Sequence, residues 1–119
     1  MRALFLVFLF LAACVCTADP VVDRTLTAPD GDITGLGYYS GSLYALDGTS
    51  EYVYRLDPET GDVQNSWECT QTSSRVTTGL TVTSGYVYVA AASSSSQTDP
   101  YCYRYNTSGS YVGNFDLDC

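Results

Sequence analysis

The side chains that most often carry out catalysis are scarce in this chain. It contains no histidine to act as a general base, and its five basic residues are all arginines, so no lysine can form a Schiff base. Two carboxylates could still hydrolyse a glycoside, but no pair is marked out by its surroundings. The residue types therefore favour a protein that binds or assembles over an enzyme, and no cofactor is expected.

Tyrosine is the residue most suited to ligand binding here, and all 11 tyrosines lie between positions 38 and 111. Most are predicted to pack inside a β-fold with their hydroxyls reaching the surface. Tyr38, Tyr39 and Tyr111 are the candidate binding residues, because an exposed ring can stack on a sugar or another flat ligand. Trp67 is expected to fill a core instead.

Acidic residues gather in two short stretches, 30–32 and 57–62. Their oxygens could hold calcium, but the full calcium-loop pattern is absent, so turn formation is the favoured interpretation and no metal site is predicted. Arg55 and Arg104 are expected to pair with these loop acids.

The chain carries 13 acidic and five basic residues, a formal net charge of -8. Binding to nucleic acid requires a basic patch that releases counterions, and the arginines here are scattered. Nucleic acid is therefore excluded as a partner, and the acidity is expected to favour solubility.

Residues 1–18 are predicted to be an export signal, because Arg2 is followed by an apolar run from Ala3 to Ala13. Two cleavage sites compete. Residues 11–14 resemble a bacterial lipobox, which would place a lipid on Cys14, whereas cleavage after Ala18 would release the protein. The chain is thus expected to be secreted, or anchored at the cell surface with lipid as its only membrane contact.

Export permits disulfides, for which Cys69, Cys102 and Cys119 are the candidates. If Cys14 is retained and carries a lipid, four other cysteines remain and could form two disulfides. If cleavage follows Ala18, three remain. The sequence does not fix their pairing. Asn106 begins a glycosylation sequon and is a candidate site if the protein is eukaryotic.

The part of the chain after residue 32 contains an internal repeat. The order of the matching residues is kept throughout, although the offset changes between the turns. An offset of 44 places Gly35-Leu36 on Gly79-Leu80, an offset of 49 places Tyr52–Arg55 on Tyr101–Arg104, and an offset of 48 places Gly61 on Gly109 and Trp67 on Phe115.

Each repeat divides into four β-type runs separated by turn residues, and neither shows a helical period. Ser40-Gly41 and Ser84-Gly85 suit tight hairpins, in which a positive φ is needed. The predicted strands are 33–39, 42–46, 52–57 and 62–69 in the first repeat, and 77–83, 86–91, 101–105 and 110–117 in the second.

The first repeat resembles a blade of the quinoprotein-like, YVTN and lactonase-type β-propeller superfamily. The matching residues are Gly35-Leu36-Gly37-Tyr38, Ser42-Leu43-Tyr44-Ala45-Leu46-Asp47 and Tyr52–Val63 with its Asp57-Pro58-Glu59-Thr60-Gly61 turn. The resemblance covers residues 33–119 and implies an all-β fold of two four-stranded antiparallel propeller-type blades, 33–75 and 76–119. The second blade departs from the pattern, because Asn106-Thr107-Ser108-Gly109 replaces the proline-containing turn.

Two blades are too few to close a propeller, which has about four to eight. The chain is therefore a fragment of a longer protein, or several copies complete one ring, or copies stack into an open assembly. Within the N-terminal segment 19–32, residues 21–26 form a β-type run that would close a ring or complete a neighbour's blade. A plain linker is the alternative.

Function is expected to follow from this incomplete architecture. The leading hypothesis is a non-catalytic extracytoplasmic binding module for a glycan, a surface or a protein, acting after self-association. A structural subunit that polymerises through open blade edges into a fibre is the alternative. A fragment of a propeller lyase or lactonase comes third, because histidine is missing.

Overall fold

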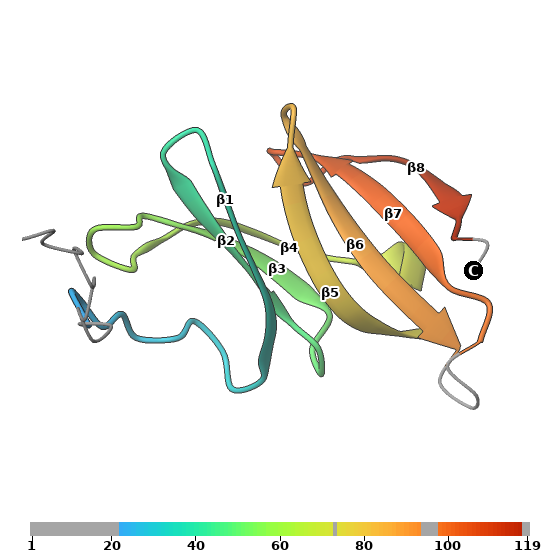
Figure 1. Ribbon diagram of the computed structural model, residues 1–119, viewed down its shortest axis with the longest axis horizontal. Helices are drawn as coiled ribbons and strands as arrows, with labels where there is room; N and C mark the ends of the chain where they lie inside the picture. Colours follow the sequence, from blue (N-terminus) through green and yellow to red (C-terminus); the bar gives the residue numbers. More distant parts are fainter. Residues whose placement is uncertain (1–21, 73, 94–97, 118–119) are drawn as a thin grey trace, which may run out of the picture.

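The computed structural model describes residues 22–72, 74–93 and 98–117, which form two four-stranded antiparallel sheets (Figure 1). In each sheet every strand pairs with the next one in sequence. This confirms the predicted all-β fold, and the predicted strand ends differ from the observed ones by two residues at most. The strands are β1 (Ile33–Tyr39), β2 (Ser42–Asp47), β3 (Tyr52–Leu56) and β4 (Val63–Glu68), then β5 (Arg75–Thr83), β6 (Tyr86–Ser93), β7 (Tyr101–Asn106) and β8 (Tyr111–Asp116).

The first hairpin of each sheet turns at a serine followed by a glycine, as predicted. Ser40 and Gly41 have φ angles of 48° and 80°, and Ser84 and Gly85 have 52° and 80°. Two consecutive positive φ angles give a turn whose twist matches that of the flanking strands.

The irregularities of the two sheets also fall at matching positions. Each sheet has one bulge where its first two strands pair and one where its last two strands pair. The sheets are therefore structural copies of one another in the register of the sequence repeat, while the resemblance to propeller blades stays a prediction. The bulges lie at Ile33/Gly35 and Thr77/Gly79, and at Arg55/Leu56 and Arg104/Tyr105.

A single 3-10 turn, Thr70–Thr72, links the two sheets and is the only helical element in the part of the chain that the structure describes. Thr72 is buried, and its hydroxyl lies 2.6 Å from the Cys69 carbonyl oxygen and 3.0 Å from Glu51 Oε2. The link thus has a polar anchor at the edge of the core.

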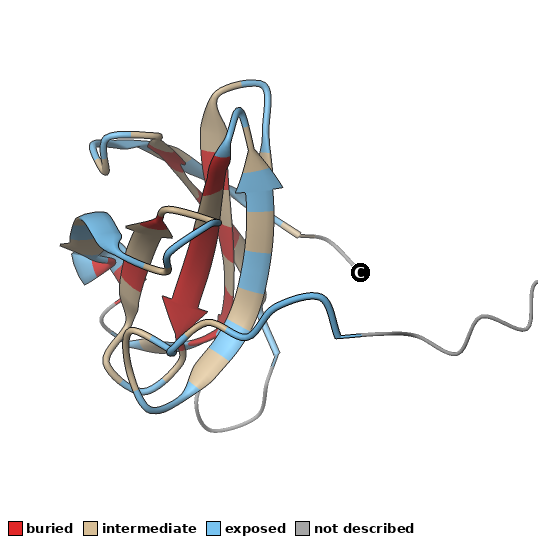
Figure 2. Cartoon of the chain, turned by 90° about the vertical axis from the view of Figure 1, so that its left-hand side faces the viewer, coloured by how far each residue is buried: buried red, intermediate tan, exposed pale blue. Residues whose placement is uncertain are grey.

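The core lies between the two sheets, which pack face to face with β1 alongside β5 (Figure 1). Buried residues occupy the central strands, whereas exposed residues alternate along β1 (Figure 2). Each sheet therefore has one face in the core and one turned away from it. The core residues are Tyr44, Leu46, Val53, Cys69, Val87, Val89, Ala91, Tyr103 and Tyr105.

Residues 22–29 form no strand and lie beside the first sheet, on the side away from the second (Figure 1). The prediction of a closing strand at 21–26 concerns a ring or a neighbouring copy, so it stays a prediction. The export signal, Cys14 and Cys119 lie outside the described residues. Within the described ranges, no helix is long and apolar enough to cross a membrane.

Candidate functional site

The face of the first sheet that points away from the core carries large apolar side chains. The strand register places Leu36 beside Ala45, Tyr38 beside Leu43, and Leu43 beside Leu56. Leu36 and Tyr38 are 63% and 64% exposed. We call this surface of Leu36, Tyr38, Leu43, Ala45 and Leu56 the first outer face.

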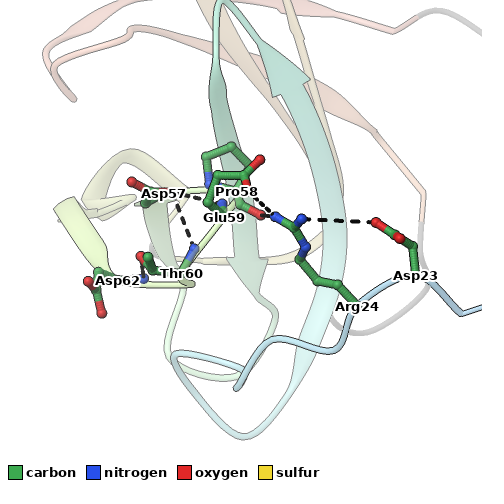
Figure 3. Close-up of polar contacts among 7 residues, drawn as sticks. All are labelled: Asp23, Arg24, Asp57, Pro58, Glu59, Thr60 and Asp62. Carbon is green, nitrogen blue, oxygen red and sulfur yellow. Dashed lines mark hydrogen bonds and ion pairs between the residues drawn. The ribbon is translucent and has the colours of Figure 1, made fainter.

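The N-terminal segment covers one part of the first outer face. A hollow of about 200 Å³ separates residues 26–29 from Leu36, Leu43 and Leu56. Arg24 donates a hydrogen bond of 2.5 Å to Glu59 Oε2 in the turn between β3 and β4 (Figure 3). Sequence reasoning did not predict this contact, because Arg24 and Glu59 are 35 positions apart and no local motif links them.

The second sheet also has a face turned away from the core. Its register places Gly79 beside Ala90, Ala90 beside Cys102 and Cys102 beside Phe115. A groove of about 270 Å³ runs along it, and Phe115 is 47% exposed. We call this surface the second outer face; it comprises Gly79, Thr81, Tyr88, Ala90, Cys102, Arg104 and Phe115.

Two aromatic contacts order the second outer face. The rings of Tyr88 and Phe115 meet edge to face with centroids 6.5 Å apart, and the Arg104 guanidinium lies 4.9 Å from the centroid of Tyr86. Such contacts hold the side chains in place without covering them. The face is therefore a pre-formed apolar surface with one positive charge at its side.

A small polar pocket of about 140 Å³ lies where the two sheets meet. Its lining includes Tyr39, Ser42, Arg55 and Thr107, and Arg55 Nε donates to Ser42 Oγ at 3.2 Å. Within the single chain the predicted pairing of Arg55 and Arg104 with loop acids is wrong, because neither arginine forms an ion pair with a described residue of the same chain. The ion pairs of the described chain join Arg24 to Asp23 and Glu59, and Arg75 to Asp99.

The structure does not bring the three candidate tyrosines into one site. Tyr38 lies on the first outer face, whereas Tyr39 packs against the core and lines the polar pocket. Tyr111 is 40% exposed on β8, its ring is 5.8 Å from that of Tyr105, and its hydroxyl accepts a hydrogen bond from Asn114. Trp67, expected in the core, packs against it.

The carboxylates of the acidic stretches hold turns together, as their sequence setting predicts. Asp30 accepts hydrogen bonds from the Gly31 amide, the Ser50 hydroxyl and the Tyr54 hydroxyl. Asp57 Oδ1 accepts from the amides of Glu59 and Thr60 (Figure 3). No cluster of three or more potential metal ligands occurs among the described residues.

Asp47 is the one buried carboxylate in the described ranges, at 1% exposure. It accepts hydrogen bonds from the amides of Asp32, Thr49 and Ser50 at 2.7 to 2.9 Å. The amide of Ser50 above all lowers the pKa of Asp47 below 3.8, against the opposing effect of burial. Asp47 is therefore ionised at neutral pH and fixes the loop between β2 and β3.

The cysteines that the structure describes are both buried and free. Cys69 lies in the core, where burial raises its pKa to about 11, and Cys102 lies on the second outer face, where burial also raises its pKa. The disulfides proposed for Cys69, Cys102 and Cys119 stay a prediction, because Cys119 lies outside the described residues.

Asn106 closes the turn between β7 and β8. Its Oδ1 accepts hydrogen bonds from the amides of Ser108 and Ser110 at 3.1 and 2.9 Å. The side chain is thus already used within the turn, and its glycosylation stays a prediction.

Comparison with known proteins adds no family to this description. The chain matches no protein-family model, and no curated protein matches it either. The two outer faces and the polar pocket are the surface features of the described chain that suit binding.

Proposed function

We propose that this chain is a non-catalytic extracytoplasmic binding module that acts after self-association. The observation that carries the proposal is the pair of outer faces, on which Leu36, Tyr38 and Phe115 are about half exposed or more. Contiguous apolar surface of this kind marks an interaction site. Because one such face lies on each side of the two sheets, the chain can contact partners in two directions.

The extent of the core supports the same proposal. The described residues bury one core between two sheets and leave apolar side chains exposed on the outer side of each sheet. If further sheets covered the outer faces, each Å² of apolar surface removed from water would contribute about 25 cal/mol of stabilising free energy. The free-energy cost of association is set against this gain. Self-association is thus the simplest way to complete the core.

The polar pocket is the best candidate for a small ligand in the assembled protein. Arg55 supplies guanidinium donors, Tyr39 and Tyr44 supply ring surface, and Ser42 supplies a hydroxyl. This combination of a few polar groups with aromatic walls suits a glycan. A glycan array on the wild type and on Arg55→Ala tests this assignment, and binding that survives the substitution would contradict it.

Light scattering after size-exclusion chromatography tests self-association. The purified secreted protein is expected to show a discrete mass that is a multiple of one chain. Elongated polymers in electron micrographs would favour the alternative, a structural subunit that grows into a fibre through the exposed edge strands β4 and β8. A single-chain mass at every concentration would contradict both functions.

A further inference from the structure

We infer that copies of this chain dock head to tail, with the second outer face of one copy covering the first outer face of the next. We infer also that the N-terminal segment occupies part of this docking site in the single chain. The inference rests on the proposed self-association and names the surfaces that produce it.

The second outer face repeats the core face of the first sheet. Residues of the second sheet that point outward align with residues of the first sheet that pack in the core. The face that is covered in the first sheet is thus uncovered in the second. The aligned pairs, core residue first, are Tyr44 and Tyr88, Leu46 and Ala90, Val53 and Cys102, and Trp67 and Phe115. Arg55, which lines the polar pocket, aligns with Arg104 in the same way.

The first outer face in turn repeats the core face of the second sheet. The contact inferred between copies is therefore already present once inside each chain, between the first sheet and the second. Repeating the same contact from copy to copy continues that arrangement. The aligned pairs, outer residue first, are Leu36 and Leu80, Tyr38 and Val82, Leu43 and Val87, and Ala45 and Val89.

The groove on the second outer face is positioned to receive Leu36 of the next copy. Inside the chain, Leu80 packs so closely on Gly35 that a Cβ atom there would lie 2.9 Å from the Leu80 amide nitrogen. Gly79 is the repeat equivalent of Gly35, and nothing lies within 4 Å of its Cβ position. The position on the second sheet that corresponds to Gly35 is thus unoccupied in the single chain.

Charge complementarity supports the same register. Inside the chain, Arg55 and Thr107 line one pocket. The repeat equivalent of Arg55 is Arg104, and that of Thr107 is Glu59. Docking in the same way therefore places Arg104 of one copy near Glu59 of the next, which joins opposite charges.

The N-terminal segment already fills the places that a neighbouring copy would fill. Arg24 pairs with Glu59, where Arg104 of the neighbour is expected (Figure 3). Leu26 lies 3.4 Å from the Cβ position of Gly61, the repeat equivalent of Gly109, against which Trp67 packs. The segment thus takes the places of both Arg104 and Phe115, and docking has to displace it.

Leu36→Arg tests the docking face, with association measured by sedimentation velocity over a concentration series. The exposed position leaves the fold intact, while a buried arginine at the docked interface is expected to weaken association at least tenfold. Val76→Arg is the matched control, because Val76 is 45% exposed and aligns with Asp32, which stays exposed when the two sheets pack together inside the chain. Tyr38→Arg replaces Leu36→Arg if the latter changes the circular dichroism spectrum.

A charge exchange tests the register. Arg104→Glu is expected to weaken association about twofold to fivefold, the range for one exposed ion pair, and adding Glu59→Arg to the same chain is expected to restore it. A double variant that associates no better than Arg104→Glu would overturn the register.

The combined variant Arg24→Ala and Leu26→Ser tests the competing segment. Removing its two anchors is expected to strengthen association severalfold, and an unchanged or weaker association would overturn this part of the inference.

The outcomes of these experiments also distinguish the proposed function from the inferred docking faces. A wild-type protein that never associates contradicts the proposed function, whereas association that Leu36→Arg leaves unchanged contradicts the docking faces alone.

Discussion

A Cβ atom at Gly109 would lie 2.7 Å from the indole ring of Trp67. This contact joins β4 of the first sheet to the turn between β7 and β8 of the second. The same indole tilts over Tyr105, with ring centroids 6.2 Å apart. Close approach of backbone and ring at this point therefore sets how the outer strands of the two sheets meet.

Gly109→Ala is expected to destabilise the fold. Gly109 has a φ of 97°, which an L side chain rarely adopts, and the added methyl group would clash with Trp67. Strain and overpacking together are expected to lower the free energy of unfolding by about 2 kcal/mol or more. Urea denaturation measures the change. Gly113→Ala is the control, because nothing lies within 4 Å of its Cβ position, and an equal loss there would contradict the contact.

Thr77→Val is expected to leave stability unchanged or to increase it by up to about 1 kcal/mol. The Thr77 hydroxyl is buried and has no hydrogen-bond partner within the described structure, so replacing it removes an unsatisfied polar group. Thr72→Val is the contrasting variant. It removes a hydroxyl that bonds to the Cys69 carbonyl or Glu51, and is expected to cost about 1–3 kcal/mol in thermal or urea unfolding. Equal effects of the two variants would contradict this difference.

The two described thiols are expected to differ in reactivity. Cys69 is fully buried with its pKa raised to about 11, so iodoacetamide should modify it only when the protein unfolds. Cys102 is 8% exposed on the second outer face and should react faster in the native monomer. Peptide mapping by mass spectrometry distinguishes the two sites, and rapid native labelling of Cys69 would contradict its burial.

Acid is expected to destabilise the fold partly through Asp47. Its pKa is lower in the folded protein than the ordinary 3.8, so the stability that it adds is fully present above that value and is lost as pH falls through the folded pKa. Urea denaturation from about pH 6 to about pH 2 measures this loss. Asp47→Asn should flatten the acid part of the curve, because an amide side chain does not titrate in this range; an acid limb as steep as that of the wild type would contradict the role of Asp47.

Local residue chemistry predicted most of the fold. Ser40-Gly41 and Ser84-Gly85 specify hairpins whatever surrounds them, because few residues accept consecutive positive φ angles. Between such turns, short runs rich in Tyr and Val have few alternatives to a strand. The strand ranges were therefore predicted to within two residues, and the 3-10 turn at Thr70–Thr72 was not, because it has no periodicity of its own.

The candidate site was predicted less well, for a physical reason. Alternation shows that Tyr38 and Tyr39 lie on opposite faces, but it does not show which face packs against the other sheet. Arg55 was expected to meet an acid, yet the sheet packing places it beside Ser42 in a pocket instead. Such choices depend on how the two sheets meet, and this is not encoded in any one strand.

The pairing of every strand with its neighbour in sequence has a consequence for how the chain matures. Each sheet is a meander, so its pairings need only short loop closures, which form within microseconds. When the chain emerges from a ribosome or a translocation pore with its N-terminus first, β1 to β4 can pair while β5 is still inside. If the chain folds in this order, each sheet forms from strands that are neighbours in sequence. The packing of one finished sheet on the other is then the only step that joins distant parts of the described chain.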